Sequence, residues 1–235
     1  MSQQTFIDSI SESAIEDMIN TGVLASVTIA QACLESAWGK SAIGNNLFGI
    51  KGSGTVQATD EFINGEWITI QAGFRVYQSW LASISDHSLF LLTNPWYRSA
   101  GFFMHCVSRN YEGAAWALQS AGYATDPNYA TKLTNLINSY ALYKYDQEAD
   151  EMLETIKALQ AQVLDLQGTC QTLLKTADAH IDKINTLETQ NSMPVPDWAK
   201  DAVLSAQSCG LVDTPEGRSH DFYSLIVILH RKGLI

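Results

Sequence analysis

An unbroken seam of mostly apolar residues between positions 152 and 191 most constrains what this chain can fold into. Its positions alternate in steps of four and three, and ten of the twelve are apolar. They are Met152, Ile156, Leu159, Val163, Leu166, Cys170, Leu173, Ala177, His180, Ile184, Leu187 and Asn191. The resulting period of about 3.5 residues is typical of a coiled coil rather than of a helix on a globular core.

This seam predicts self-association through residues 147–192. The seam consists of two alternating sets of positions. Partly β-branched residues in the set that starts at Ile156, and mostly leucines in the set that starts at Met152, favour a parallel dimer. His180 and the small Cys170 and Ala177 weaken that preference, so a trimer stays open. The alternative is one long helix packed back on its own domain.

The seam divides the chain into three predicted parts. Residues 1–146 form a mixed, aromatic-rich domain, residues 147–192 a rod, and residues 193–235 a small module of two helices. No Gly or Pro occurs between Pro127 and Gly168, so we expect one helix to run from the first domain into the rod. The module is too short to bury a stable core alone, and oligomerisation of the rod would compensate for this.

Composition excludes several function classes. The net charge of −11 argues against nucleic-acid binding, which needs clustered Lys and Arg. No apolar run approaches the roughly 20 residues of a membrane span, and the N-terminus does not read as a secretory signal. The four cysteines lack metal-ligand spacing, so we expect reduced core thiols, no metal and no cofactor.

Glu35 stands out in a helix expected over residues 24–38, which is apolar on most sides and is followed by Gly39. The last turn of a helix carries the negative end of its dipole, and apolar neighbours also disfavour a charged carboxylate. Both effects raise the pKa of Glu35, as a general acid requires. The alternative is a charge that simply points to solvent.

A β-hairpin is expected around Asn64-Gly65, which lies between two β-prone runs. Glu61 would lie beside that turn as a second carboxylate, and glycoside hydrolysis commonly uses such a pair. Glu61 can equally be an ordinary hairpin charge. With further helices expected over 79–92 and 111–120, the predicted fold class is α+β, mostly helical with one small hairpin.

Three segments together resemble the bacterial glucosaminidase family (glycoside hydrolase family 73). They are SVTIAQACLESAWGKSAIGNNLFGIKG, TDEFINGEWITIQAGFRVYQSWLASISDHSLFLL and LQSAGYATDPNYATKL. The resemblance covers about residues 5–145. It implies a lysozyme-like fold and hydrolysis of the β-1,4 bond between N-acetylglucosamine and N-acetylmuramic acid in peptidoglycan.

The resemblance also implies site residues. It makes Glu35 the general acid and Glu61 the second acidic residue, although the acetamido group of the substrate can take that second role in some members. Tyr123 is expected near the bond that is cut. Further residues expected to line the cleft and bind substrate are Asn46, Phe48, Trp80 and Tyr129. His87 stands where many relatives carry Tyr, and we expect it to pack, with Asp86 structural.

The C-terminal segment more loosely resembles a surface-layer-homology repeat. It shares Trp198-Ala199, Gly210-Leu211, Gly217 and His230-Arg231, but it has Ser219-His220-Asp221 where the family has Thr-Arg. Such modules bind secondary cell-wall polymers, and a plain oligomer cap is the alternative.

The function expected from all of this is an endolysin, made in the host cytoplasm and released to the wall by a holin. A virion-associated tail lysin and a non-catalytic oligomeric wall-binding protein are the alternatives.

Overall fold

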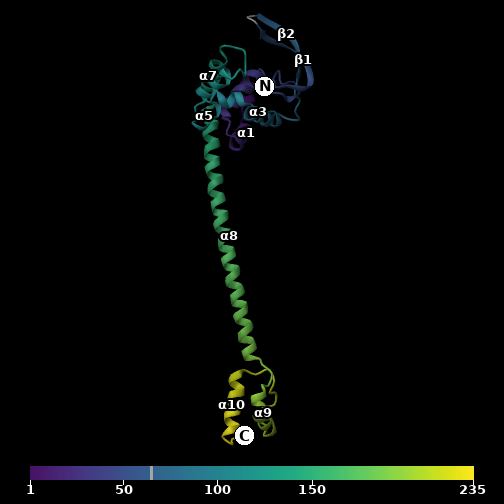
Figure 1. The fold of residues 1–235 in the computed structure, drawn as a ribbon, viewed down its shortest axis with the longest axis vertical. Coiled ribbons are helices and arrows are strands. Elements are labelled where there is room, and N and C mark those ends of the chain that lie inside the picture. The colour runs from purple at the N-terminus through teal and green to yellow at the C-terminus, as the bar shows by residue number, and fades with distance from the viewer. Residues whose placement is uncertain (64–65) are drawn as a thin grey trace. The chain divides into compact units, whose positions relative to one another are not determined.

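The computed structural model describes the backbone of residues 1–63 and 66–235, with side chains outside 59–67. The chain divides into two compact units, Met1–Ala158 and Leu159–Ile235. Figure 1 shows the elements of both. No helix among the described residues combines the length and apolar character needed to cross a membrane. Each unit is described by itself.

The first unit is a set of helices around a buried central helix. These elements are α1 (Gln3–Thr21), α2 (Ala25–Glu35), η1 (Ile43–Asn45), α3 (Trp80–Thr93), α4 (Pro95–Ser99), α5 (Phe102–Val107), α6 (Tyr111–Ser120), α7 (Tyr129–Ser139) and the start of α8 (Tyr143–Asn191). Every residue of α2 from Ala25 to Cys33 is buried. Helices α1, α6 and α7 pack against it, so α2 carries its last residue, Glu35, on a rigid support.

The N-terminus of α2 is completed by a residue 120 positions away. Its N-cap residue, Leu24, offers no side-chain acceptor. Asp146 of α8 accepts hydrogen bonds from the backbone N–H of Ser26 at 2.8 Å and from its hydroxyl at 2.6 Å. Because Asp146 and Ser26 are both buried, this contact fixes the start of α8 to the core of the unit.

The expected helix from Pro127 into the rod is interrupted. Helix α7 ends at Ser139, and the chain turns at Ala141, which has a φ of 49°. The long helix α8 then begins at Tyr143. The prediction was wrong about the starting point because Ala141 adopts a left-handed conformation that residues other than Gly rarely take.

The predicted hairpin is present as β1 (Lys51–Ile63) paired antiparallel with β2 (Glu66–Phe74). The turn residues 64 and 65 lie outside the described residues. Figure 1 shows the two strands extending away from the helices of this unit. At the base of the hairpin, Arg75 and Tyr77 both donate to the carboxylate of Asp86 in α3, at 2.6 Å each. Asp86 is therefore a structural carboxylate, as expected.

The second unit contains most of α8 and a small helical module made of η2 (Asp197–Ala199), α9 (Lys200–Ser208) and α10 (His220–Arg231). The core of the module centres on Tyr223, whose hydroxyl donates to the carbonyl of Pro215 at 2.6 Å.

The predicted core thiols are only partly confirmed. Cys33 and Cys106 are buried, whereas Cys170 and Cys209 are exposed. Both exposed cysteines belong to the second unit, where the long helix and the small module bury few side chains.

Candidate active site

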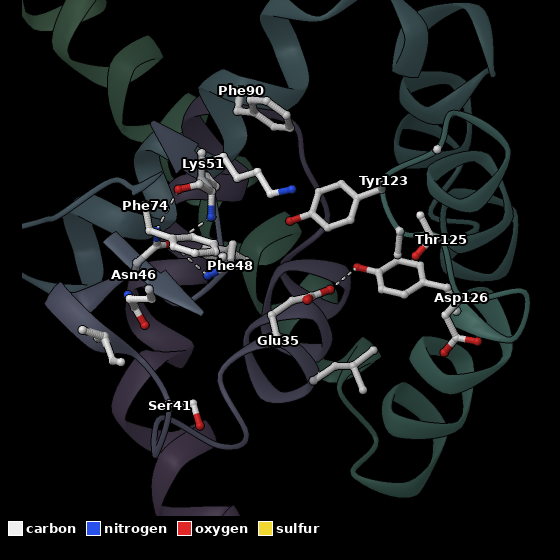
Figure 2. Close-up of a pocket in the computed structure, with 18 of the residues that line it drawn as sticks. Glu35, Ser41, Asn46, Phe48, Lys51, Phe74, Phe90, Tyr123, Thr125 and Asp126 are labelled. Carbon is white, nitrogen blue, oxygen red and sulfur yellow. Dashed lines mark hydrogen bonds between the residues drawn. The ribbon is translucent and has the colours of Figure 1, made fainter. Parts of the chain in front are cut away.

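An open cavity of about 700 Å³ lies at the C-terminal end of α2. We call it the Glu35 cavity. Its wall comes from the end of α2, segment 41–51, the base of the hairpin, the loop 122–126 and the start of α7. Figure 2 shows Glu35 on one side of this space, with Phe48 and Lys51 on the hairpin side and Tyr123 and Asp126 across from them. Its size suits several sugar units.

Glu35 is placed by an abrupt helix end. The expected helix over 24–38 stops at Glu35, because Ala37 and Trp38 take φ values of 48° and 62°. The hydroxyl of Ser36 accepts a hydrogen bond from the backbone of Gly39 at 2.7 Å and stabilises this turn. Left-handed backbone at residues other than Gly is costly and often accompanies functional sites.

The electrostatic environment of Glu35 favours its protonated form. Burial raises the pKa of Glu35 to about 7, while a hydrogen bond from Tyr129 and the charge of Lys132 act in the opposite direction. Glu35 is nevertheless an exposed residue that lines the cavity, so solvent there limits the shift. A bound sugar strand that displaces this solvent would raise the pKa further. The carboxyl can therefore hold a proton near neutral pH.

Two tyrosines stand beside Glu35. Tyr129, the first residue of α7, is buried and donates its hydroxyl hydrogen to Oε1 of Glu35 at 2.8 Å. Its ring stacks on that of Tyr123 with 5.7 Å between the centroids. The buried hydroxyl of Tyr123 has no hydrogen-bond partner among the described residues.

Asn46 and Phe48 line the cavity, but Asn46 is fully occupied within its own loop. Its amide nitrogen donates to the carbonyls of Ile50 and Arg75, both at 3.0 Å, and its oxygen accepts from the backbone N–H of Ile50 at 3.1 Å. Asn46 therefore holds the loop in place. Phe48 stacks on His87 with 3.9 Å between the ring centroids.

His87 packs as expected. It is fully buried, and burial lowers its pKa to about 3, so the ring is neutral. His87 thus places a flat, neutral ring against Phe48.

Two expected site residues need comment. Trp80 is not part of the cavity wall: its ring lies against Phe6 at 5.4 Å, in a space that Gly39 leaves open. The sequence could not reveal this, because the direction of the ring depends on how α3 packs against α1.

The backbone of Glu61 pairs with that of Ile68 within the hairpin, while its side chain lies outside the described residues.

Three polar residues of the site were not expected from the sequence. Lys132 and Asp126 line the cavity and form an ion pair at 2.5 Å. Gln31 is fully buried in α2 and donates its amide hydrogen to the hydroxyl of Tyr129 at 2.9 Å. A buried Gln four residues before Glu35 lies on the same helix face, and that spacing could have indicated it.

In the described part of the chain, no cluster of three or more His, Cys, Asp or Glu is arranged to hold a metal.

Comparison with known families decides the classification of this chain. Residues 11–142 match the Glucosaminidase family, described as mannosyl-glycoprotein endo-beta-N-acetylglucosaminidase. The chain belongs to this family. The match covers the whole of the Glu35 cavity.

Individual relatives agree. The chain is 41% identical to exo-glucosaminidase LytG of Bacillus subtilis over 62% of its length and 54% of that protein. It is 43% identical to peptidoglycan hydrolase FlgJ of Escherichia coli over 50% of its length and 40% of that protein. The chain thus spans about half the length of the curated relatives it matches.

Solved structures confirm the fold. The catalytic domain of the autolysin Auto from Listeria monocytogenes is 41% identical, with a TM-score of 0.52 over 61% of this chain and 86% of that one. A mutant peptidoglycan hydrolase from Sphingomonas sp. A1 is 32% identical, with a TM-score of 0.52 over 63% and 99%. The lysozyme-like α+β fold expected from the sequence is therefore confirmed.

Proposed function

We propose that this chain is a glycoside hydrolase that cleaves peptidoglycan between N-acetylglucosamine and N-acetylmuramic acid, as an endo-β-N-acetylglucosaminidase. One observation carries the proposal: a carboxyl with a pKa of about 7 lies at the end of a buried helix and faces a cavity large enough for a glycan strand. Relatives named exo-glucosaminidase, autolysin and peptidoglycan hydrolase support the substrate class.

The proposed reaction begins with proton transfer from Glu35 to the glycosidic oxygen. The electron pair of the C1–O bond leaves with that oxygen, which departs as a hydroxyl group. Water then bonds to C1, where positive charge has developed, and gives up one of its two protons to a carboxylate, so that C1 keeps a hydroxyl group. Either Glu61 or the acetamido group of the substrate assists this attack. Tyr123 would donate its hydroxyl to the bound sugar.

Digestion of purified cell walls tests this proposal. Wild type should release soluble fragments, and Glu35→Gln should release at least about a hundredfold less, since the amide cannot donate the catalytic proton. Equal clearance by both proteins would refute the role of Glu35. If both proteins sediment with walls and neither releases fragments, the chain is a non-catalytic wall-binding protein.

Mass spectrometry of the fragments identifies the bond. Relatives named probable N-acetylmuramidase show that the choice of bond needs its own test. Fragments ending in reducing N-acetylglucosamine support our proposal, whereas reducing N-acetylmuramic acid would mean a muramidase. Chain-internal products distinguish endo from exo cleavage.

We further propose that α8 binds a second copy of this chain. Apart from the half-buried Ile156, the large apolar residues of its seam expose between 47% (Leu187) and 63% (Leu173) of their surface. In a parallel pair in register, Lys183 of one copy would lie opposite Glu188 of the other, and the opposite charges favour that orientation. The predicted boundaries of this rod, 147 and 192, stay predictions.

Sedimentation at micromolar concentration tests this association. Wild type should sediment as a dimer or trimer, and Leu166→Glu should shift it to monomer. Leu164→Glu is the matched control, because Leu164 is as exposed as Leu166 but lies off the seam. A wild-type monomer, or equal effects of both substitutions, would refute the proposal.

The biological setting is a separate part of the proposal. We propose an endolysin that reaches the wall after holin-type release, with the module at 193–235 binding a secondary wall polymer or capping the oligomer. Co-purification with phage particles would indicate a virion-associated lysin instead. Loss of wall retention on deletion of residues 193–235, with the oligomer unchanged, would support polymer binding.

A further inference from the structure

A continuous hydrogen-bond chain leads from the core of the first unit to Glu35. The amide nitrogen of Gln31 donates to the hydroxyl oxygen of Tyr129 at 2.9 Å, and that hydroxyl donates to Oε1 of Glu35 at 2.8 Å. Gln31 is fully buried, and Tyr129 is 2% exposed. Figure 2 shows the bond to Glu35 as a dashed line. Tyr129 and Glu35 both line the cavity, whereas Gln31 lies behind them in the core.

The direction of the chain follows from the hydrogens available. An ionised Glu35 carries no hydrogen, so the hydrogen in its contact with Tyr129 must come from the phenol. Burial, and then the charge of Glu35, raises the pKa of Tyr129 well above its ordinary value, so the phenol keeps its hydrogen. The N–H of Gln31 occupies a lone pair of the phenol oxygen, and the single phenol hydrogen is left to point at Glu35.

We propose that Gln31 is a positioning residue for the general acid. Acting through Tyr129, it keeps Oε1 of Glu35 a hydrogen-bond acceptor, so the catalytic proton resides on Oε2. This inference rests on the proposed glycosidase function. In the acid step the proton passes from Oε2 to the glycosidic oxygen, and the phenol of Tyr129 keeps its own hydrogen throughout.

Loss of the Gln31 donor frees the phenol to rotate. A protonated Glu35 can then place its hydrogen on Oε1 and donate it to Tyr129 instead of to the substrate. An ionised Glu35 also loses a firmly oriented donor, which raises its pKa. Both changes act on the protonation of Glu35, and the substituted residue, Gln31, is not part of the cavity wall.

The test compares wild type with Gln31→Met, which keeps the length of the side chain but removes the donor. Thr28→Val is the matched control, because Thr28 is also fully buried in α2 and its hydroxyl has no partner among the described residues. On soluble glycan strands, Gln31→Met should lower kcat about tenfold, with KM within about twofold. Its alkaline pH limit should move upward, while Thr28→Val should behave as wild type.

A double mutant separates positioning from packing. Because Gln31 acts only through Tyr129, adding Gln31→Met to Tyr129→Phe should cost no further activity. If the two losses multiply, or if Gln31→Met keeps the kcat and pH profile of wild type, the inference is overturned. Gln31→Glu, which accepts the phenol hydrogen instead of donating, should lose at least as much as Gln31→Met. It serves as the test variant if Gln31→Met does not fold.

A titration independent of catalysis completes the test. Carbon-13 NMR of the Glu35 carboxyl should give a higher pKa in Gln31→Met than in wild type and in Thr28→Val. Inactive wild type would refute the proposed function, whereas an unchanged titration in Gln31→Met would refute the hydrogen-bond chain itself.

Discussion

Replacing Asp146 by Asn should change how the stability of the first unit depends on pH. Asp146 is 4% exposed and accepts two hydrogen bonds from Ser26 at the N-terminus of α2. Burial raises its pKa from 3.8 to about 6, and the bonds from Ser26 only partly oppose that. Asn has the same shape and can accept from the backbone N–H of Ser26 while donating to its hydroxyl, but it does not ionise.

The sign and size follow from the shift in pKa. Between pH 4 and pH 6 the folded protein keeps a proton on Asp146 that the unfolded chain has lost, so unfolding becomes easier as the pH rises. A shift of about two units corresponds to about 3 kcal/mol of unfolding free energy. This contribution is fully present below the unfolded pKa and is lost as the pH passes the folded value of about 6.

Denaturant unfolding at several pH values between 4 and 7 measures this effect. Tryptophan fluorescence reports mainly on the first unit, which holds all of the tryptophans except Trp198. The unfolding free energy of Asp146→Asn minus that of wild type should grow by about 3 kcal/mol across this range. Other carboxyls, such as buried Asp17, titrate alike in both proteins and cancel. A difference that stays constant, or that falls as the pH rises, would refute the reasoning.

Further predictions concern the candidate active site and two glycine positions. Wild-type activity should fall above a pH of about 7, because Glu35 must be protonated to act as the general acid that we propose. A rate profile that rises through pH 8 would contradict this. Gly54→Ala should cost about 1–3 kcal/mol in chemical denaturation, because its Cβ would clash with the carbonyl oxygen of Phe74. Gly168→Ala should instead stabilise α8 by about 1 kcal/mol, since no atom lies within 4 Å of the added carbon. A lower melting temperature of the helical circular dichroism signal would refute the last expectation.

Local sequence signals predicted the elements whose patterns are local. The hairpin followed from two β-prone runs around Asn64-Gly65, and α6 begins and ends at the expected residues, Tyr111 and Ser120. Helix ends set by unusual backbone were missed. Glu35 ends α2 three residues early and Ala141 separates α7 from α8, in both cases through left-handed conformations that no Gly announces.

The site divides in the same way. Glu35 could be chosen from the sequence because a carboxylate in an apolar helix is unusual by itself. The role of Asn46 in holding its loop could not be predicted from the sequence. Its amide nitrogen donates not only to Ile50 in the same loop but also to the carbonyl of Arg75, 29 positions away. The position of Trp80 against Phe6, outside the cavity wall, could not be read from the sequence either, since nothing local shows which neighbour its ring will meet.

The sequence by itself determined the candidate for the general acid, the helical fold with one hairpin, and the long helix with its seam. Each of these features is visible in the order and spacing of neighbouring residues. Only the tertiary structure decided what surrounds Glu35. Tyr129 bonds to Glu35 although the two are 94 positions apart in the sequence. Asp146 completes the N-terminus of the helix that carries Glu35 by bonding to Ser26, which lies 120 positions before it. Hydrogen bonds of this kind depend on how helices pack in space, and packing joins residues that no local pattern connects.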